Sequence, residues 1–151
     1  MSAYCTPTAA GLDNMLTMVV GEDAESSPSS KTAIEASHHA LFKDGDDVVV
    51  ATCSCNIEAA AGLSCALSMI PPGGAEDMID EKELTETAKA NYYEVMNIFS
   101  SLFMDDRSAH LRLTEIGTGA PPVELDKGES VAFTLDLDRY GNDGEIVFRH
   151  V

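Results

Sequence analysis

The sequence predicts an α+β domain in which an antiparallel β-sheet packs against a layer of helices. Apolar residues recur at steps of three and four in some segments, as in helices with one buried face, and alternate with polar residues in others, as in strands. The predicted order is helix, hairpin, helix, long helix and strands, which is typical of this class. Because 151 residues suit one core, we expect residues 1–151 to form a single domain.

The first half of the chain is expected to begin with a helix from about Thr6 to Gly21, followed by a loop over 22–31. Two strands over 32–42 and 47–55, joined by a turn at 43–46, come next. A helix from Asn56 to about Met69 follows and ends at a corner over 71–74. Thr6 with Pro7 suits a helix start, and Asn56 suits an N-cap. Residues 22–31 hold no core-forming side chain, which predicts an irregular connector.

The last third is expected to form strands over 109–116, 130–138 and 145–151, separated by a loop at 117–122 and turns at 126–129 and 140–144. Val131, Phe133, Leu135 and Leu137 alternate with polar residues, which predicts one buried face.

One long helix, expected from Leu84 to Phe103, organises the prediction. Its apolar stripe consists of Leu84, Ala88, Asn91, Val95, Ile98, Phe99 and Leu102. At about 100° per residue, a neighbouring flank gathers Glu83, Ala90, Glu94, Asn97 and Ser101 within roughly 60°. The helix therefore presents a carboxylate and a carboxamide three residues apart among small residues.

The net charge of −17 comes from 26 acidic and 9 basic residues. Such a surface repels phosphate backbones and anionic membranes, so we expect neither a nucleic-acid nor a membrane partner. No apolar run approaches the roughly 18 residues of a membrane span. The N-terminus lacks the pattern of a signal peptide, so a cytoplasmic location is expected.

The chain contains four cysteines, Cys5, Cys53, Cys55 and Cys65. A chain of this size needs no disulfides, and we expect buried structural thiols. A zinc site formed by Cys53, Cys55, Cys65 and either His38 or His39 is an alternative, but it lacks the paired spacing of structural zinc sites. The adjacent histidines would also point to opposite faces of a strand. A redox role is a further alternative.

Familiar catalytic motifs are missing from the sequence. It contains no phosphate-binding loop, dinucleotide-binding glycine pattern, HExxH or GxSxG. The pair Glu94 and Asn97 remains, although Glu and Asn also occur on ordinary solvated helix faces. Asn is a poor helix former, so its place in the middle of a predicted helix favours a functional role.

The Glu94-x-x-Asn97 pair on a long helix resembles the signature of the CheC/CheX/FliY group of chemotaxis phosphatases. In that group, Asp or Ser usually precedes the Glu by four residues, and Pro follows the Asn after about 22 residues. This chain has Ala90 at the first position, and Pro121 lies one residue beyond the second. Ser101 stands where relatives often have Gly, whereas the order of elements is similar to CheX over nearly the whole chain.

The resemblance implies a phosphatase that acts on the aspartyl phosphate of a CheY-type response regulator. Asn97 would orient the attacking water, and Glu94 would pair with the active-site lysine of the receiver domain. The chain would need no cofactor or metal of its own, because the receiver holds the Mg²⁺. Relatives of the CheX type also pair through their sheets, which makes a homodimer an expectation.

Two other functions fit the same residues. Ala90, and the absence of Gly at position 101, are also expected for a non-catalytic binding or adaptor protein of this fold that engages a receiver domain. An unrelated acidic α+β domain with a structural or interaction role is the third hypothesis. It predicts that Glu94 and Asn97 lie under packing or far from any concave surface.

Overall fold

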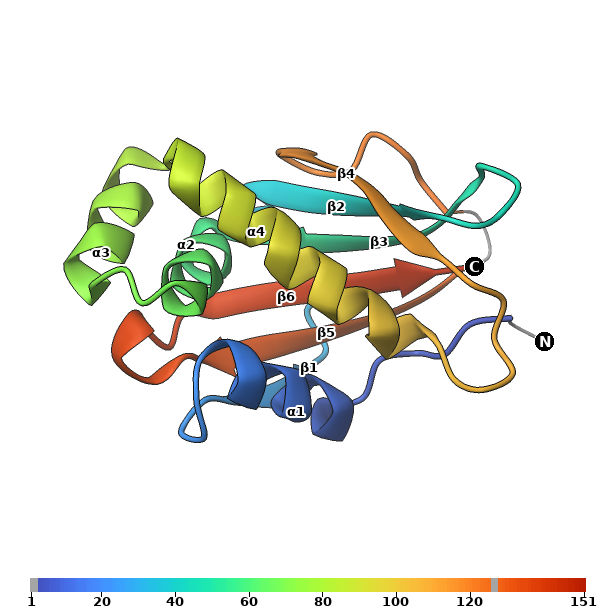
Figure 1. The fold of residues 1–151 in the computed structure, drawn as a ribbon, viewed down its shortest axis with the longest axis horizontal. Coiled ribbons are helices and arrows are strands. Elements are labelled where there is room, and N and C mark those ends of the chain that lie inside the picture. The colour runs from blue at the N-terminus through green and yellow to red at the C-terminus, as the bar shows by residue number, and fades with distance from the viewer. Residues whose placement is uncertain (1–2, 126–127) are drawn as a thin grey trace.

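A computed structural model describes residues 3–125 and 128–151 of the chain. Helices α1, α2 and α4 cover one face of a sheet, and α3 lies beyond one end of it (Figure 1). In the described residues the helices are α1 (Ala9–Val19), α2 (Ile57–Leu67), α3 (Pro72–Glu81) and α4 (Glu86–Phe99), with short 3₁₀ helices η1 (Ser100–Phe103) and η2 (Asp138–Tyr140). The strands are β1 (Glu25–Ser29), β2 (His38–Lys43), β3 (Val49–Cys55), β4 (Arg112–Thr118), β5 (Glu129–Asp136) and β6 (Gly144–His150). The predicted α+β class is confirmed.

The six strands form an antiparallel sheet in the order β1-β5-β6-β3-β2-β4. The predicted hairpins β2–β3 and β5–β6 are confirmed by their pairing. The turn expected at 126–129 lies partly outside the described residues. None of the helices described in residues 3–125 and 128–151 is long and apolar enough to cross a membrane.

An aromatic cluster fixes α4 and η1 to the sheet. The ring centroid of Phe148 on β6 lies 6.2 Å from that of Phe99 and 5.8 Å from that of Phe103. Phe103 also lies 5.4 Å from Phe42 on β2, and Phe133 on β5 lies 6.1 Å from Phe148. Aromatic pairs at such separations contribute about 0.5–1.5 kcal/mol each beyond their buried area. These contacts therefore stabilise the packing of α4 against the sheet.

The loop predicted over 22–31 is wrong, because residues 25–29 form the edge strand β1, which pairs with β5. The side chains of β1 are polar and largely exposed, so its stability comes from backbone hydrogen bonds and carries no apolar signature. Pro28, which has no N–H, is tolerated because the strand lies at an edge. Asp13 of α1 holds the strand by accepting hydrogen bonds from the Ser26 N–H and Oγ, both at 2.7 Å.

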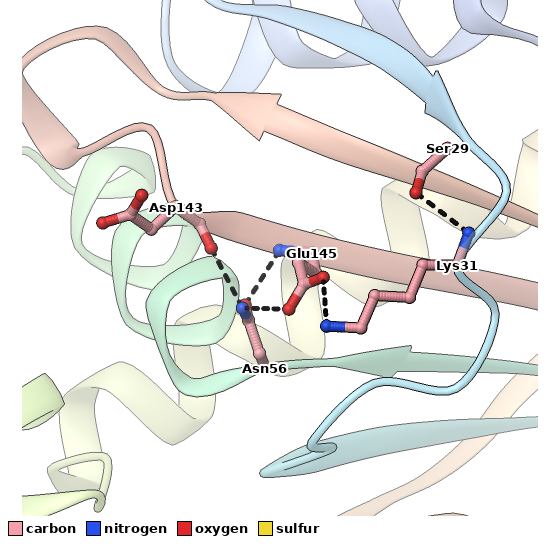
Figure 2. A network of polar contacts seen from close by, with 5 residues as sticks. All are labelled: Ser29, Lys31, Asn56, Asp143 and Glu145. Carbon is pink, nitrogen blue, oxygen red and sulfur yellow. Dashed lines mark hydrogen bonds and ion pairs between the residues drawn. The ribbon is translucent and has the colours of Figure 1, made fainter.

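Of the strand predicted over 32–42, only residues 38–42 lie in a strand, β2. Since β5, β6 and β3 separate β1 from β2, the connection over 30–37 has to cross the sheet. It crosses the face opposite the helices, where Arg149 Nη2 donates to the Thr32 carbonyl at 3.1 Å. Lys31 Nζ lies 3.4 Å from Glu145 Oε2 and adds a second attachment (Figure 2).

The corner predicted over 71–74 is instead the beginning of helix α3. Pro72 occupies the first turn, where its fixed φ suits a helix and its missing N–H leaves no bond unmade. Lys82, with φ 55°, ends the helix in the left-handed region. In α1 the N-cap is Thr8, whose side chain accepts from the Gly11 N–H, so the predicted cap at Thr6 is also wrong.

Asn56 caps α2 as predicted and also joins this helix to β6. Its Oδ1 accepts from the N–H groups of Ala59 at 3.0 Å and Glu145 at 2.9 Å. Its Nδ2 donates to the Asp143 carbonyl at 3.0 Å and to Glu145 Oε1 at 3.3 Å (Figure 2). One buried side chain thus fixes the start of α2 against the start of β6.

Candidate functional site

Helix α4 carries the predicted site and crosses the sheet diagonally (Figure 1). Thr85 is its N-cap and accepts from the Ala88 N–H at 3.2 Å. The predicted helix over 84–103 divides into α4 and η1, and the change occurs at Ser100. The buried residues of α4 are Ala88, Tyr92, Val95, Met96 and Phe99, so Tyr92 and Met96 join the predicted stripe.

Glu94 and Asn97 are exposed on the side of α4 opposite this buried stripe. Within the described part of the chain, neither side chain has a hydrogen bond or an ion pair. Both functional groups are therefore available to a partner molecule. Packing does not cover them, which removes one of the two arrangements expected for an unrelated interaction domain.

The backbone at Asn97 is held more firmly than its side chain. The Asn97 carbonyl accepts from Ser100 Oγ at 2.6 Å, and the Ser100 N–H bonds to the same carbonyl. Ser101 Oγ likewise donates to the Ile98 carbonyl at 3.0 Å. These bonds tighten the end of α4 into a 3₁₀ turn, so Asn97 presents its amide from a defined position.

Small exposed residues surround the pair. Ala90 and Ser101 lie on the same exposed side as Glu94 and Asn97, as predicted, and their short side chains leave the longer ones protruding. Tyr93, which is 40% exposed, is the nearest exposed large hydrophobic side chain in the sequence. This side of α4 can therefore approach a partner surface without obstruction from its immediate neighbours.

The remaining residues singled out from the sequence lie elsewhere. Pro121 is half-buried in the loop that follows β4. Asn91, placed in the apolar stripe, is only half-buried. Its Nδ2 donates to the Ser64 carbonyl at 2.9 Å and to Ser68 Oγ at 2.7 Å, which ties α4 to α2. Asn91 thus holds α4 against α2, whereas the Asn97 side chain makes no hydrogen bond to the described residues.

The cysteines are free, and three of them are buried as predicted. Burial, with a contribution from Cys55, raises the pKa of the Cys53 thiol, and burial raises that of Cys65. Both thiols therefore stay protonated and unreactive at neutral pH. Among the described residues, no three His, Cys, Asp or Glu side chains are placed to share a metal ion. His38 contacts Tyr92 of α4, whereas His39 bonds to the Gly119 carbonyl, so the two rings have separate surroundings.

No protein-family model matches the sequence, and no curated protein matches it. The structure resembles FliY from Thermotoga maritima with a TM-score of 0.61 and 13% identity, covering 91% of this chain and 81% of FliY. It resembles the FliM middle domain from H. pylori with a TM-score of 0.51 and 11% identity, covering 94% and 84%. CheX from Vibrio vulnificus overlaps at a TM-score of 0.46 with 15% identity, covering 92% of this chain and 93% of CheX. The chain thus has the fold of FliY and FliM, as the predicted resemblance to the CheC/CheX/FliY group implies.

Proposed function

We propose that the chain is a phosphatase for the aspartyl phosphate of a CheY-type response regulator. The observation that carries this proposal is the pair Glu94 and Asn97, exposed and without partners on one side of α4. The FliY fold supports it, because the sequence resemblance to that group rests on the same two residues.

The proposed mechanism requires only positioning and hydrogen bonding from this chain. The Asn97 amide enters the active site of the receiver and orients a water molecule in line with the phosphorus atom. Its N–H group also stabilises the charge that develops on the transferred phosphoryl group. Glu94 pairs with the receiver's active-site lysine and fixes the orientation of docking. Positioning of this kind contributes up to about 7–11 kcal/mol in ideal cases.

The test is the rate at which a phosphorylated CheY-type receiver, with its Mg²⁺, loses its aspartyl phosphate. We expect the wild-type chain to accelerate the loss and Asn97→Ala to abolish the acceleration. Glu94→Gln is expected to raise the concentration needed for half-maximal effect, because it removes the ion pair that orients docking. Thr87→Ala, another exposed substitution on α4, is the matched control and should leave the rate unchanged.

An adaptor that binds a receiver domain without catalysis is the second candidate function. Ala90 favours it, because this position holds Asp or Ser in the phosphatase signature that the sequence resembles. The same assay separates the two proposals when receiver binding is measured beside it. Binding that depends on Glu94, together with dephosphorylation no faster than with Asn97→Ala, would establish the adaptor and refute the phosphatase.

A further inference from the structure

A cavity of about 720 Å³ lies at one end of the sheet, between the first turns of α2 and the C-terminal part of α3. Its walls include the start of β2 at His38, the end of β4 at Thr118 and the start of β6 at Glu145. Its volume falls within the roughly 300–1,000 Å³ of small-molecule sites. Neither Glu94 nor Asn97 lines it, so it is separate from the site proposed above.

The charged groups that line the cavity are mostly acidic. The lining includes two lysines, Lys82 and Lys89, and five carboxylates: Glu35, Glu58, Asp80, Glu83 and Glu145. Among the carboxylates, Glu145 is paired with Lys31. Among the lysines, Lys89 is paired with Glu86, which lies outside the cavity lining. The other four carboxylates have no hydrogen bond or ion pair to any part of the chain that the structure describes. The cavity thus presents an excess of unpaired negative charge.

The buried residue His38 also lines this cavity. The residue is only 4% exposed, and its Nδ1 lies 3.0 Å from Ser37 Oγ. Within the described chain its Nε2 has no hydrogen-bond partner. Burial lowers the pKa of His38, with smaller contributions from Lys89 and His39, so its ring is uncharged at neutral pH. When Nδ1–H donates to Ser37, Nε2 can accept a hydrogen bond from a ligand.

The placement of these groups on separate elements argues for an extended cation and against a metal ion. Among the described residues, no three His, Cys, Asp or Glu side chains are close enough to coordinate one ion. Asp80 and Glu83 come from the end of α3 and the segment after it, whereas Glu58 comes from α2. A ligand with two separated ammonium groups can pair with carboxylates on both sides, which a point charge cannot do.

We propose that this cavity binds a small organic diamine, which pairs with the unpartnered carboxylates and donates to His38 Nε2. The inference does not depend on the proposed phosphatase activity, and it is tested by binding alone.

The probe is 1,5-diaminopentane, titrated into the full chain by calorimetry at about 0.15 M salt, where long-range attraction to the acidic surface is screened. We expect saturable one-to-one binding. The double variant Asp80→Asn/Glu83→Gln should bind about tenfold or more weakly, because it removes two charge-assisted partners. The control Glu22→Gln/Asp23→Asn removes the same charge from exposed residues after α1 and should leave the affinity unchanged.

A second readout places the ligand. The ring proton signals of His38 should shift during the titration, while those of the exposed His110 should not. Equal weakening in the two double variants, or equal binding of Mg²⁺ and the diamine, would show attraction to the acidic surface alone and overturn the proposal. Absence of saturation at about 10 mM diamine, a concentration at which even weak sites near a 1 mM Kd fill, would overturn it as well.

Discussion

Asn91 and Asn97 lie on the same helix in opposite surroundings. The Asn91 amide makes two hydrogen bonds to α2, whereas the Asn97 amide is exposed and makes none to the described residues. Asn is less favourable than Ala in a helix interior by up to about 0.7 kcal/mol. Position 97 therefore carries a stability cost that no side-chain hydrogen bond or ion pair to the described residues offsets.

This difference predicts opposite effects on stability. Asn97→Ala should raise the free energy of unfolding by about 0.5 kcal/mol and abolish the proposed activity. Asn91→Ala should lower it by about 1–2 kcal/mol, because two hydrogen bonds to α2 are lost, and should leave the chemistry intact. Urea denaturation of both variants measures the two free energies, and a destabilised Asn97→Ala would mean that this side chain has a structural role.

His38 makes the stability depend on pH. Burial, Lys89 and His39 lower its pKa in the folded chain, whereas the unfolded chain has the ordinary value of about 6.5. As the pH falls through about 6.5, the unfolded state takes up a proton before the folded state does, so stability decreases until the folded pKa is passed. Above about pH 6.5 the His38 ring is neutral in both the folded and the unfolded chain, so its protonation no longer lowers the stability of the fold.

We therefore expect His38→Gln to show a smaller loss of stability than the wild type between pH 7 and the lower folded pKa. Denaturant unfolding at several pH values measures the slope of the free energy of unfolding against pH. The exposed His110→Gln is the matched control and should keep the wild-type slope. Identical slopes for all three proteins would show that His38 is not responsible for the effect.

At the scale of elements, the edge strand β1 is attached to α1 through one carboxylate, Asp13. The strand has polar side chains and an edge position, and Asp13 of α1 accepts two hydrogen bonds from Ser26. Since so little apolar surface holds β1, its local opening should cost less free energy than that of the central strand β3.

Asp13→Ala should therefore loosen β1 selectively. Loss of this acceptor leaves the Ser26 N–H without its partner, at a cost of about 1–3 kcal/mol. Hydrogen exchange should accelerate at the amides of Glu25–Ser29 and remain slow in β3, while Glu22→Ala serves as the exposed control. Uniform acceleration over the whole sheet would mean instead that β1 opens only when the entire fold does.

At the scale of the whole molecule, the net charge of −17 acts on every element at once. Only a few ion pairs offset it in the described chain, and each has at least one exposed partner: Lys31–Glu145, Lys43–Asp47, Lys89–Glu86 and, when its ring is protonated, His150–Glu129. Repulsion among like charges destabilises a compact state, and salt screens it. A homodimer through a sheet edge remains a prediction, and β1 and β4 form those edges.

The denaturation midpoint should accordingly rise when NaCl increases from about 10 mM to 200 mM, as the Debye length falls from about 30 Å to below 10 Å. Potassium chloride at the same ionic strength should act equally, because screening does not depend on the identity of the ion. A midpoint that falls with salt would indicate that the exposed ion pairs outweigh the repulsion.

Much of the fold could be predicted because it follows from local patterns. Asn56 was predicted to cap α2, the Val-rich segment to form β3, and Glu94 with Asn97 to share an exposed side of α4. Each of these depends on residues that are neighbours in the chain. The prediction failed for β1, whose partner β5 lies about a hundred residues away, and for α3, where prolines that end one helix also begin the next.

The sequence by itself determined most of the residues that face the core along α1, α2, β3, β5 and β6, because apolar residues recur there with the periods of 3.6 and 2 that helices and strands have. It also placed Glu94 and Asn97 together. Only the tertiary structure decided that a polar segment closes one edge of the sheet, that residues 30–37 cross its back, and that separate elements enclose a cavity around His38. The pairing of β1 and the enclosure of the cavity depend on segments distant in the chain, and the polar, largely exposed side chains of β1 carry no period of two that would reveal its pairing.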